Sequence, residues 1–292
     1  MKEQLIGFST SLFGWISDRY SESFKKVKDA LIKADIKIPF RSYFAFSIFV
    51  SVISYIISFV VLFFLFTYVW EVNFLLKIAY LIFLPIMIGI FTFGFMLFYP
   101  FQRMHSRRVD IEVNLPFVLT HMGAIAESGV PPYVIFKLIS QFKEYGEITK
   151  EFEKIVTGIE VFGLDPLTAM KNVAKRTPSD KLRQVLEGIV TTTEAGGNIT
   201  FYLKTVGEQT LFEWRTKRQR FIQQLSTFAE IYTGLVIASP IFIISLLAVL
   251  SIVQPNIGGF NIVDLTKVAV YGIIPAINII FLLILKTMEV EM

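Results

Sequence analysis

The sequence predicts an all-α membrane protein with four transmembrane helices and a six-helix cytoplasmic domain inserted between two membrane hairpins. Three observations support this fold class. The 292 residues are 54% hydrophobic and only 18% charged, which is too apolar for an ordinary soluble domain of this length. Four uncharged apolar runs reach the length of about 18 residues or more that a membrane span needs. A polar, charged stretch with helical periodicity separates the first two runs from the last two.

Residues 1–42 precede the first apolar run and carry basic and acidic side chains together, unlike a cleaved signal peptide, so we expect the amino terminus to remain attached. Steps of three and four place one apolar stripe on an amphipathic helix. The stripe consists of Leu5, Phe8, Leu12, Ile16, Tyr20, Phe24, Val27 and Leu31. We expect this helix to pack on the protein's own cytoplasmic domain. The alternative is a helix in the membrane interface, with Lys25, Lys26 and Lys28 near lipid head groups.

The first hairpin is predicted over residues 43–102. Tyr43–Tyr68 has no charge, and its length of roughly 39 Å exceeds a hydrocarbon core of about 30 Å, so the helix spans with some tilt. A short loop holding Trp70, Glu71 and Lys77 leads to the second uncharged run, Ile78–Gln102. Small hydroxyl residues repeat along one face of the first run, where we expect the neighbouring helix to approach closely. They are Ser47, Ser51, Ser54 and Ser58.

The second hairpin is predicted over residues 230–287. Its two spans and the loop between them are Ile231–Val253, Val268–Leu285 and Gln254–Lys267. Each span contains one proline, Pro240 or Pro275. Because proline removes a helix hydrogen bond, we expect both spans to be kinked there.

Basic residues set the expected orientation. They flank the spans on one side, whereas each opposite loop carries a single lysine. By the positive-inside rule, both termini, the tail 288–292 and the central domain are cytoplasmic, in a multi-pass protein of the cytoplasmic membrane. The flanking residues are Lys33, Lys37, Arg41, Arg103, Arg107, Arg108, Arg215, Lys217, Arg218 and Arg220.

The central domain, residues 103–229, is divided into six helices by glycine and proline. The expected inward residues of the first five helices are Ile111, Leu115, Val118, Met122 and Ile125; Val134, Leu138 and Phe142; Ile148, Phe152, Ile155 and Ile159; Leu167, Met170 and Ala174; and Leu182, Val185, Ile189 and Thr193. Asp165, Thr177 and Asn198 are expected to be N-caps. Beyond Asn198 the only breaker before Ile231 is Gly207, so we expect the sixth helix to run into the third span.

The first and fifth helices end alike, in Glu127-Ser128-Gly129 and in Glu194-Ala195-Gly196-Gly197. Glycine suits the left-handed conformation that ends many helices. We assign Glu127, Gly129, Glu194, Gly196 and Gly197 to helix ends, with the glutamates there or in pairs between helices. The repeated ending favours two copies of a three-helix unit.

The composition argues against most catalytic chemistry. The chain has no cysteine, which removes disulfides, thiolate nucleophiles and cysteine-bound metals. It has no phosphate-binding glycine loop and only two histidines, His105 and His121. No nucleophile–base pair or pair of acids within a span presents itself. We therefore predict no enzyme, no catalytic residue, no cofactor and no metal. With 17 basic and 14 acidic residues, the central domain does not carry the charge of a nucleic-acid binder.

The order of these elements resembles the type II secretion system F family, the platform proteins of secretion and type IV pilus machines. The resemblance rests on the two hairpins, on Leu115-Pro116 opening the central domain and on the two Glu-small-Gly endings. It includes the lead-in Ala34-Asp35-Ile36-Lys37-Ile38-Pro39, as in archaeal members of the archaellum and Tad-like pilus groups. Asp35 stands where such lead-ins often have glycine.

The resemblance implies a non-catalytic platform beneath a growing filament that binds a hexameric secretion ATPase and draws pilin-like subunits from the bilayer. Many archaeal members resemble two modules in one chain, so this single module implies a second copy or a half-length paralogue as dimer partner. A small-solute transporter and a membrane-bound enzyme are the alternatives.

Two groups of residues are candidates for partner contacts. For the ATPase they are Arg107, Arg108, Arg215, Lys217 and Arg218, although orienting the spans explains the same charges. For a pilin-like helix they are Glu230, Gly234 and Ala238, spaced by four along one helical face. The alternative for Glu230 is a position at head-group level, paired with a nearby basic residue.

Overall fold

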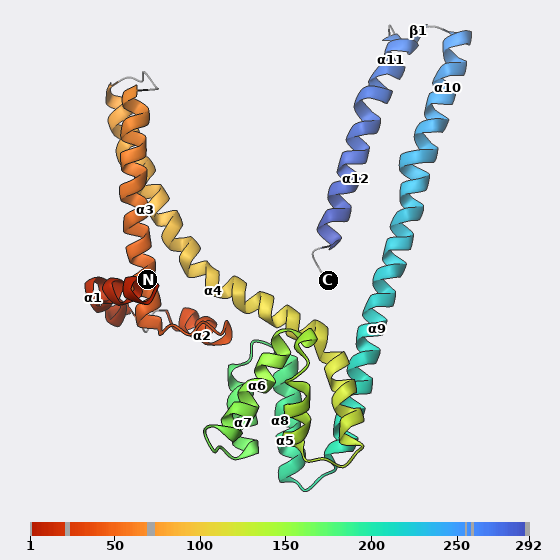
Figure 1. The fold of residues 1–292 in the computed structure, drawn as a ribbon. Helices are drawn as coiled ribbons and strands as arrows, with labels where there is room; N and C mark the ends of the chain where they lie inside the picture. The colour runs from red at the N-terminus through yellow and green to blue at the C-terminus, as the bar shows by residue number, and fades with distance from the viewer. Residues whose placement is uncertain (1, 21–23, 69–73, 255, 258–259, 290–292) are drawn as a thin grey trace. The chain divides into compact units, whose positions relative to one another are not determined.

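The computed structural model describes residues 2–20, 24–68, 74–254, 256–257 and 260–289. It forms two compact units, residues 1–211 and 212–292, and each is described by itself. The all-α prediction is confirmed, because the strands in the described part of the chain are one antiparallel pair of two residues each, β1 (Asn256–Ile257) and β2 (Phe260–Asn261) (Figure 1). Some predicted features lie outside the described residues: the loop holding Trp70 and Glu71, the side chain of Tyr20, residues 255 and 258–259 of the second loop, and residues 290–292 of the tail.

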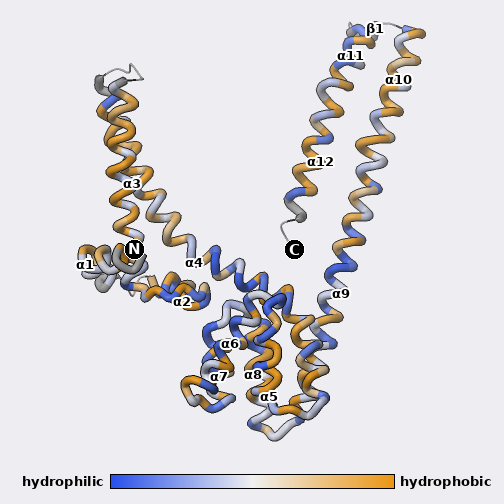
Figure 2. The backbone as a smooth tube through the Cα atoms, viewed as in Figure 1, coloured by the Kyte–Doolittle hydropathy of each residue, from blue (hydrophilic) through white to orange (hydrophobic). Residues whose placement is uncertain are grey.

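Four described helices are long and apolar enough to cross a membrane, as predicted: Phe40–Thr67, Lys77–Ala126, Ile199–Val253 and Ile262–Lys286. In Figure 2 the tube of α3 (Phe40–Tyr68) has the colour of hydrophobic residues over most of its length. The chain is therefore a multi-pass membrane protein.

The second long helix, α4 (Phe74–Ala126), joins two elements that the sequence separates, the second span and the first cytoplasmic helix. It contains Lys77, which the prediction places in the preceding loop, and it continues through Pro85, Pro100 and Pro116. Pro100 lacks the N–H that would bond the carbonyl of Met96. The hydroxyl of Tyr43 in α3 donates to that carbonyl at 2.6 Å. A side chain of the neighbouring helix thus replaces the missing backbone bond.

The serine face of α3 packs on α4, as predicted. The Ser51 hydroxyl donates to the carbonyl of Gly89 at 2.8 Å, and the hydroxyls of Ser54 and Thr92 lie 3.0 Å apart. A side chain at Gly89 would touch the Cβ atom of Tyr55 at 3.5 Å. Small residues and hydroxyl groups therefore set the close approach of the two helices.

The amino-terminal stripe belongs to two helices, α1 (Lys2–Tyr20) and α2 (Lys25–Lys33), instead of one. Val27 and Leu31 of α2 are buried against α3 and α4. On α1, which packs on α3, the stripe residues Leu5, Phe8 and Leu12 are exposed. The expectation that the whole stripe packs on the cytoplasmic domain is therefore wrong. The opposite face of α1 makes the contact, because its small residues let the helix lie close to α3; the buried ones are Ser9, Gly14 and Ser17.

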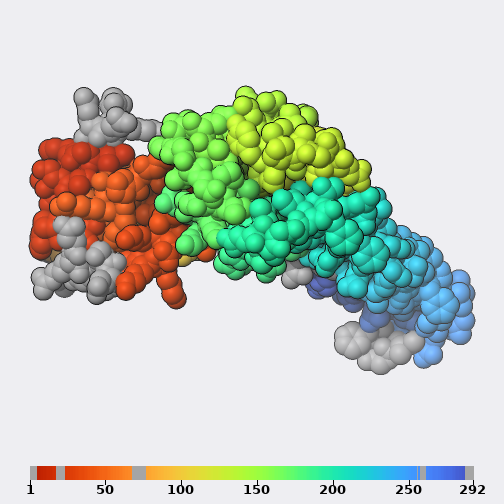
Figure 3. Space-filling view, turned by 90° about the horizontal axis from the view of Figure 1, so that it is seen from below, coloured from red at the N-terminus to blue at the C-terminus, as the bar shows by residue number. Residues whose placement is uncertain are grey.

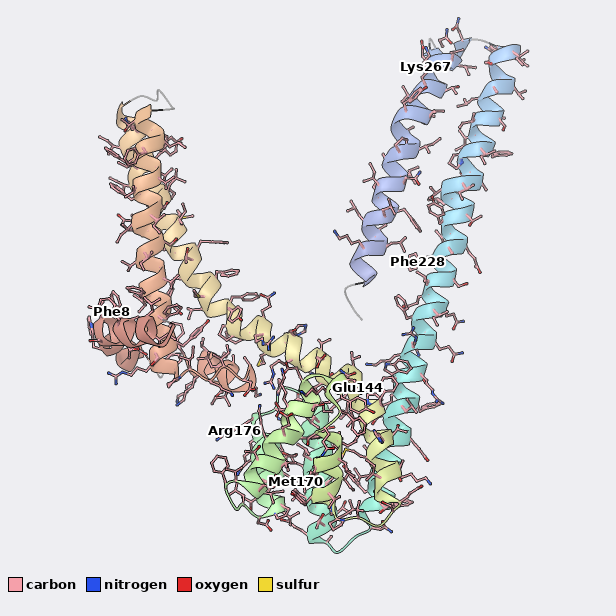
Figure 4. The ribbon with its side chains drawn as sticks, in the orientation of Figure 1. Phe8, Glu144, Met170, Arg176, Phe228 and Lys267 are labelled. Carbon is pink, nitrogen blue, oxygen red and sulfur yellow. The ribbon has the colours of Figure 1, made fainter. Side chains whose placement is uncertain are left out.

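The rest of unit 1 is a helical domain built on the end of α4. Its elements are α5 (Pro132–Ile139), the 3₁₀ turn η1 (Lys143–Tyr145), α6 (Glu147–Glu160), α7 (Pro166–Arg176), α8 (Asp180–Glu194) and the beginning of α9 (Ile199–Ile231). One continuous core joins them, and Met170 points into it (Figure 4). The predicted inward residues of α4, α6, α7 and α8 are buried or partly buried, Thr193 included.

Two local predictions in this domain are wrong. Two of the predicted inward residues are exposed: Leu138 on α5 and Phe142 after its end. Ile135, Phe136 and Ile139 are buried instead, because this helix is only eight residues long and meets the core along a neighbouring stripe. The N-cap of α8 is Ser179, whose hydroxyl accepts the N–H of Leu182 at 3.2 Å. The predicted cap Thr177 instead ends α7. The other predicted caps, at Asp165 and Asn198, accept backbone N–H groups of their helices.

The beginning of α9 lies against the end of α4 without intervening side chains. A Cβ atom at Gly207 would lie 3.1 Å from the carbonyl oxygen of Leu119, and one at Gly123 would lie 3.4 Å from the Cα atom of Lys204. Gly207, which reads as a possible helix breaker, is thus a close contact between two backbones.

Unit 2 contains the end of α9 and the second hairpin. Its further elements are the π-helix η2 (Tyr232–Ala238), α10 (Ser239–Val253), α11 (Ile262–Val268), the π-helix η3 (Ala269–Ile273) and α12 (Ile274–Glu289). Part of the predicted loop Gln254–Lys267 is therefore helical. The π-helices precede Pro240 and Pro275. A proline ring collides with the carbonyl four residues earlier, and the wider turn accommodates it.

Candidate functional site at the junction of α2, α4 and α6

Five charged side chains from three segments meet in unit 1. Asp35 follows α2, Arg107 belongs to α4, and Glu147, Glu151 and Lys154 belong to α6. We call these five residues the junction cluster.

Arg107 is the centre of the junction cluster, with only 1% of its side chain exposed. Its Nε donates to Glu147 at 2.8 Å and its Nη2 to Glu151 at 2.6 Å. Its Nη1 donates to the backbone carbonyl of Lys33 at 2.6 Å. The guanidinium therefore bonds two carboxylates and the end of α2 at once, the planar, multiple contact that arginine makes better than lysine.

The beginning of α6 is fixed by α4. Gly146, which precedes α6, has φ +63°, and a Cβ atom there would collide with the carboxylate of Asp110. That carboxylate accepts the N–H of Glu147 at 2.6 Å and lies at the positive end of the helix dipole. Steps of four and three then place Glu147, Glu151 and Lys154 on one helical face. These three side chains therefore all lie on the face of α6 that is directed toward the end of α2.

Asp35 closes the junction cluster from the amino-terminal side. It has φ +57°, the one positive value among the described residues other than glycine, and aspartate tolerates this region better than most residues. Its carboxylate pairs with Lys154 at 3.0 Å, and Lys154 also bonds Glu151 at 3.0 Å. The ion pair explains why aspartate occupies a left-handed turn where the resemblance leads one to expect glycine.

Charges in and around the cluster compensate one another. Burial raises the pKa of Glu147, but hydrogen bonds from Lys150 and Arg107 outweigh burial and lower the pKa below its usual value. Beside the cluster lies a polar cleft of about 470 Å³, lined in part by Arg103, Asp110 and Lys143. Among the described residues, no group of three or more His, Cys, Asp or Glu is placed to hold a metal ion. The arrangement holds three segments together through paired charges.

The predicted ATPase-contact residues fall into three situations. Arg107 is buried and fully engaged within unit 1, so its assignment to a docking surface is corrected to a structural role. Arg108 is exposed and pairs with Glu112 at 2.9 Å and with Asp180 at 3.8 Å. The other three, Arg215, Lys217 and Arg218, are exposed on α9 in unit 2.

The two Glu-small-Gly endings have the same construction in the structure. Glu127 pairs with Lys204 of α9 at 2.8 Å, and Glu194 pairs with Lys171 of α7 at 2.6 Å. The hydrogen bond from Lys204 lowers the pKa of Glu127. The following glycines are left-handed, with φ +75° at Gly129 and +68° at Gly196, whereas Gly197 is not. Each glutamate thus ties the end of its helix to a neighbouring helix.

Glu230, Gly234 and Ala238 are exposed in unit 2. The second and third lie in the π-helix η2. Its turns hold more residues than those of an α-helix. A spacing of four falls slightly short of one such turn, just as it slightly exceeds one turn of an α-helix, so the three positions remain near one side of the helix.

Sequence reasoning missed the junction cluster apart from Arg107. One signal is present: Glu151 falls between Ile148 and Phe152 on the apolar face of α6, where a charge requires a buried partner. The partner itself lies 44 residues away in the chain, and no local pattern identifies it.

Comparisons with known proteins agree with this architecture. Residues 118–247 match the family described as type II secretion system (T2SS), protein F. An uncharacterized protein of Methanocaldococcus jannaschii is 25% identical over 204 residues, 69% of this chain and 33% of that protein. The flagella accessory protein J of the same organism is 21% identical over 70% of this chain and 34% of its own length. The flagella accessory protein J of Methanococcus voltae is 22% identical over 59% of this chain and 30% of its own.

The chain thus spans about a third of the length of the curated relatives that it matches. No solved structure matches. The match to the family covers the last part of α4, all of α5 to α9, the π-helix η2 and the first part of α10. Residues 118–247 of this chain are therefore similar to the type II secretion system F family.

Proposed function

We propose that this chain is a non-catalytic membrane platform of an archaellum, type IV pilus or type II secretion-like machine, which couples a cytoplasmic assembly ATPase to pilin-like subunits in the bilayer. The family match and the relatives named as flagella accessory proteins support this function. Four apolar helices joined to a packed helical domain give the chain both a membrane part and a domain for a partner.

One observation carries the coupling part of the proposal. The backbone is helical from Ile199 to Val253, 55 residues in a row. At about 1.5 Å per residue this is roughly 80 Å of helix. The first turns of α9 pack on α4 in the helical domain of unit 1, through Gly207 and through Thr200, whose hydroxyl donates to the carbonyl of Ala126 at 3.0 Å. A movement of the domain is thereby passed along the helix axis to the third span.

An insertion after Arg220 tests this coupling. A flexible Gly-Ser segment should abolish filament assembly, while an alanine-rich segment of equal length, a whole number of helical turns, should preserve part of it. Both variants should reach the membrane at the normal level. Equal assembly by the two variants would show that continuity of the helix is not used.

We propose two separate contacts for the ATPase, both exposed and basic: Arg108 of α4 in unit 1, and Arg215, Lys217 and Arg218 of α9 in unit 2. Reversing the three basic residues of α9 to glutamate should abolish assembly without changing membrane insertion. The matched control reverses three other exposed basic residues, Lys143, Lys175 and Arg176. If the control has the same effect, net charge and not a specific surface is responsible.

For the pilin-like partner, we propose the exposed segment that contains Glu230, Gly234 and Ala238. Because the chain has no cysteine, Gly234→Cys provides a single thiol for crosslinking to cysteines introduced in a pilin-like subunit. Val236→Cys is the control, since Val236 lies in the same π-helix and is buried. Crosslinking at both positions or at neither counts against this surface.

We also propose that both termini and the central domain, residues 103–229, are cytoplasmic, and that two copies, or one copy and a paralogue, act together. Gln141→Cys, at an exposed position of the domain, should react with an impermeant maleimide only after the membrane is opened. Two differently tagged copies should co-purify from one membrane. Labelling of Gln141→Cys in intact cells would reverse the orientation.

A further inference from the structure

We propose that α1 is a membrane-embedded helix that lies in the plane of the bilayer at the end of the first span, with its outer face in contact with lipid. The inference concerns the amino-terminal helix alone and does not depend on the proposed function.

The outer face of α1 is apolar and uncovered in the structure. Leu5, Phe8, Leu12 and Trp15 follow one another at steps of three, four and three, and all are exposed, with 57% for Phe8 and 65% for Trp15. The steps place them on one stripe of the helix. Figure 3 shows the red surface of α1 open at the edge of unit 1.

The length and charge of the segment fit an in-plane position. The shorter apolar helix Leu5–Ser17 contains no charge, and charged residues flank it on both sides in the sequence. Thirteen residues make roughly 20 Å of helix, too short for a hydrocarbon core of about 30 Å. Tryptophan and tyrosine are enriched at membrane–water interfaces, and Trp15 lies on this stripe.

The contacts with α3 give the depth of the helix. A Cβ atom at Gly14 would lie 3.3 Å from the guanidinium of Arg41, at the charged end of α3. Six residues earlier, the ring of Phe8 meets the ring of Phe49 edge to face, with centroids 6.0 Å apart. Phe49 lies about 13 Å along the helix from Phe40, where the span begins.

The ribbon shows the same geometry. In Figure 1, α1 is seen nearly end-on beside the first turns of α3, which is seen from the side, so α1 crosses the span and does not run along it. Phe8 is labelled on this helix in Figure 4. Lipid that surrounds α3 at the level of Phe49 also reaches the outer stripe of α1. The occupant of that stripe is therefore the bilayer, because the stripe continues the lipid-facing surface of the span.

Trp15 provides the test. In the full chain with Trp70→Phe and Trp214→Phe, Trp15 is the only tryptophan. The protein is placed in phosphatidylcholine vesicles whose acyl chains carry bromine either near the head group or near the terminal methyl group. We expect strong quenching of Trp15 by the shallow bromine and weaker quenching by the deep one.

A matched reporter keeps Trp214, on α9 outside the third apolar run, after Trp15→Phe and Trp70→Phe. This tryptophan should not respond to either lipid. Absence of bromine quenching at Trp15 overturns the proposal. If acrylamide quenches Trp15, the helix lies in water; if acrylamide is excluded as well, protein covers the stripe in place of lipid.

Discussion

Replacing Arg107 with methionine should loosen the junction between α2, α4 and α6. The change removes three hydrogen bonds, to Glu147, Glu151 and the carbonyl of Lys33. Glu151, with 1% of its side chain exposed, then stays buried without its principal counter-charge. Lys154 still contacts it, but the side chain of Lys154 is 38% exposed and its attraction is screened by water.

The magnitude follows from the burial of the pair. Removing one partner of a buried ion pair costs about 3–5 kcal/mol, which for a unit of this size lowers the unfolding midpoint by about 10 °C. Arg108→Met is the matched control, one residue along the same helix but 47% exposed. Its exposed pair contributes about 0–1 kcal/mol, so its midpoint should hardly move.

The assay is thermal unfolding of the purified protein in detergent, followed by loss of helical circular dichroism. A third variant, Arg107→Met with Glu147→Gln and Glu151→Gln, removes the uncompensated charges and should recover part of the loss, because a buried pair replaced as a whole is less costly than one that is broken. Equal midpoints for Arg107→Met and Arg108→Met would refute the reasoning.

Three other substitutions test separate parts of unit 1. Gly207→Ala should destabilise the contact of α9 with α4 by about 1–3 kcal/mol, because the added methyl group meets main-chain atoms that cannot move away. Gly234→Ala is the control, since its methyl group enters open space and should leave stability unchanged. The unfolding midpoints of the two variants test this difference. Tyr43→Phe removes the hydroxyl that bonds the Met96 carbonyl and should lower the free energy of unfolding by about 1–3 kcal/mol. Tyr55→Phe, at an exposed position, is the control and should leave it unchanged. The lowered pKa of Glu147 stabilises the fold fully above the usual pKa of a glutamate, and this stability is lost as the pH falls through the lower folded value. Glu147→Gln should therefore make the unfolding midpoint less dependent on pH on the acid side. An unchanged acid dependence contradicts the stabilising role of the ionised Glu147.

The sequence by itself determined the membrane spans, the helical domain between the hairpins and most of its inward residues. These features depend on local periodicity and on the solvent around each segment, which the order of apolar, polar, glycine and proline residues records directly. The ends at Gly129 and Gly196 were predictable for the same reason, because a left-handed cap is a property of a few consecutive residues.

Only the tertiary structure decided which charges are surface and which are core. Arg107 and Arg108 are adjacent in the sequence and equal in charge, yet one is buried among carboxylates of α6 and the other is exposed. It also decided that α1 turns its small residues inward and its apolar stripe outward. Burial depends on partners that are distant in the chain, such as Glu151 for Arg107. A helix with one face of small residues and one apolar face carries no local signal for which face meets protein.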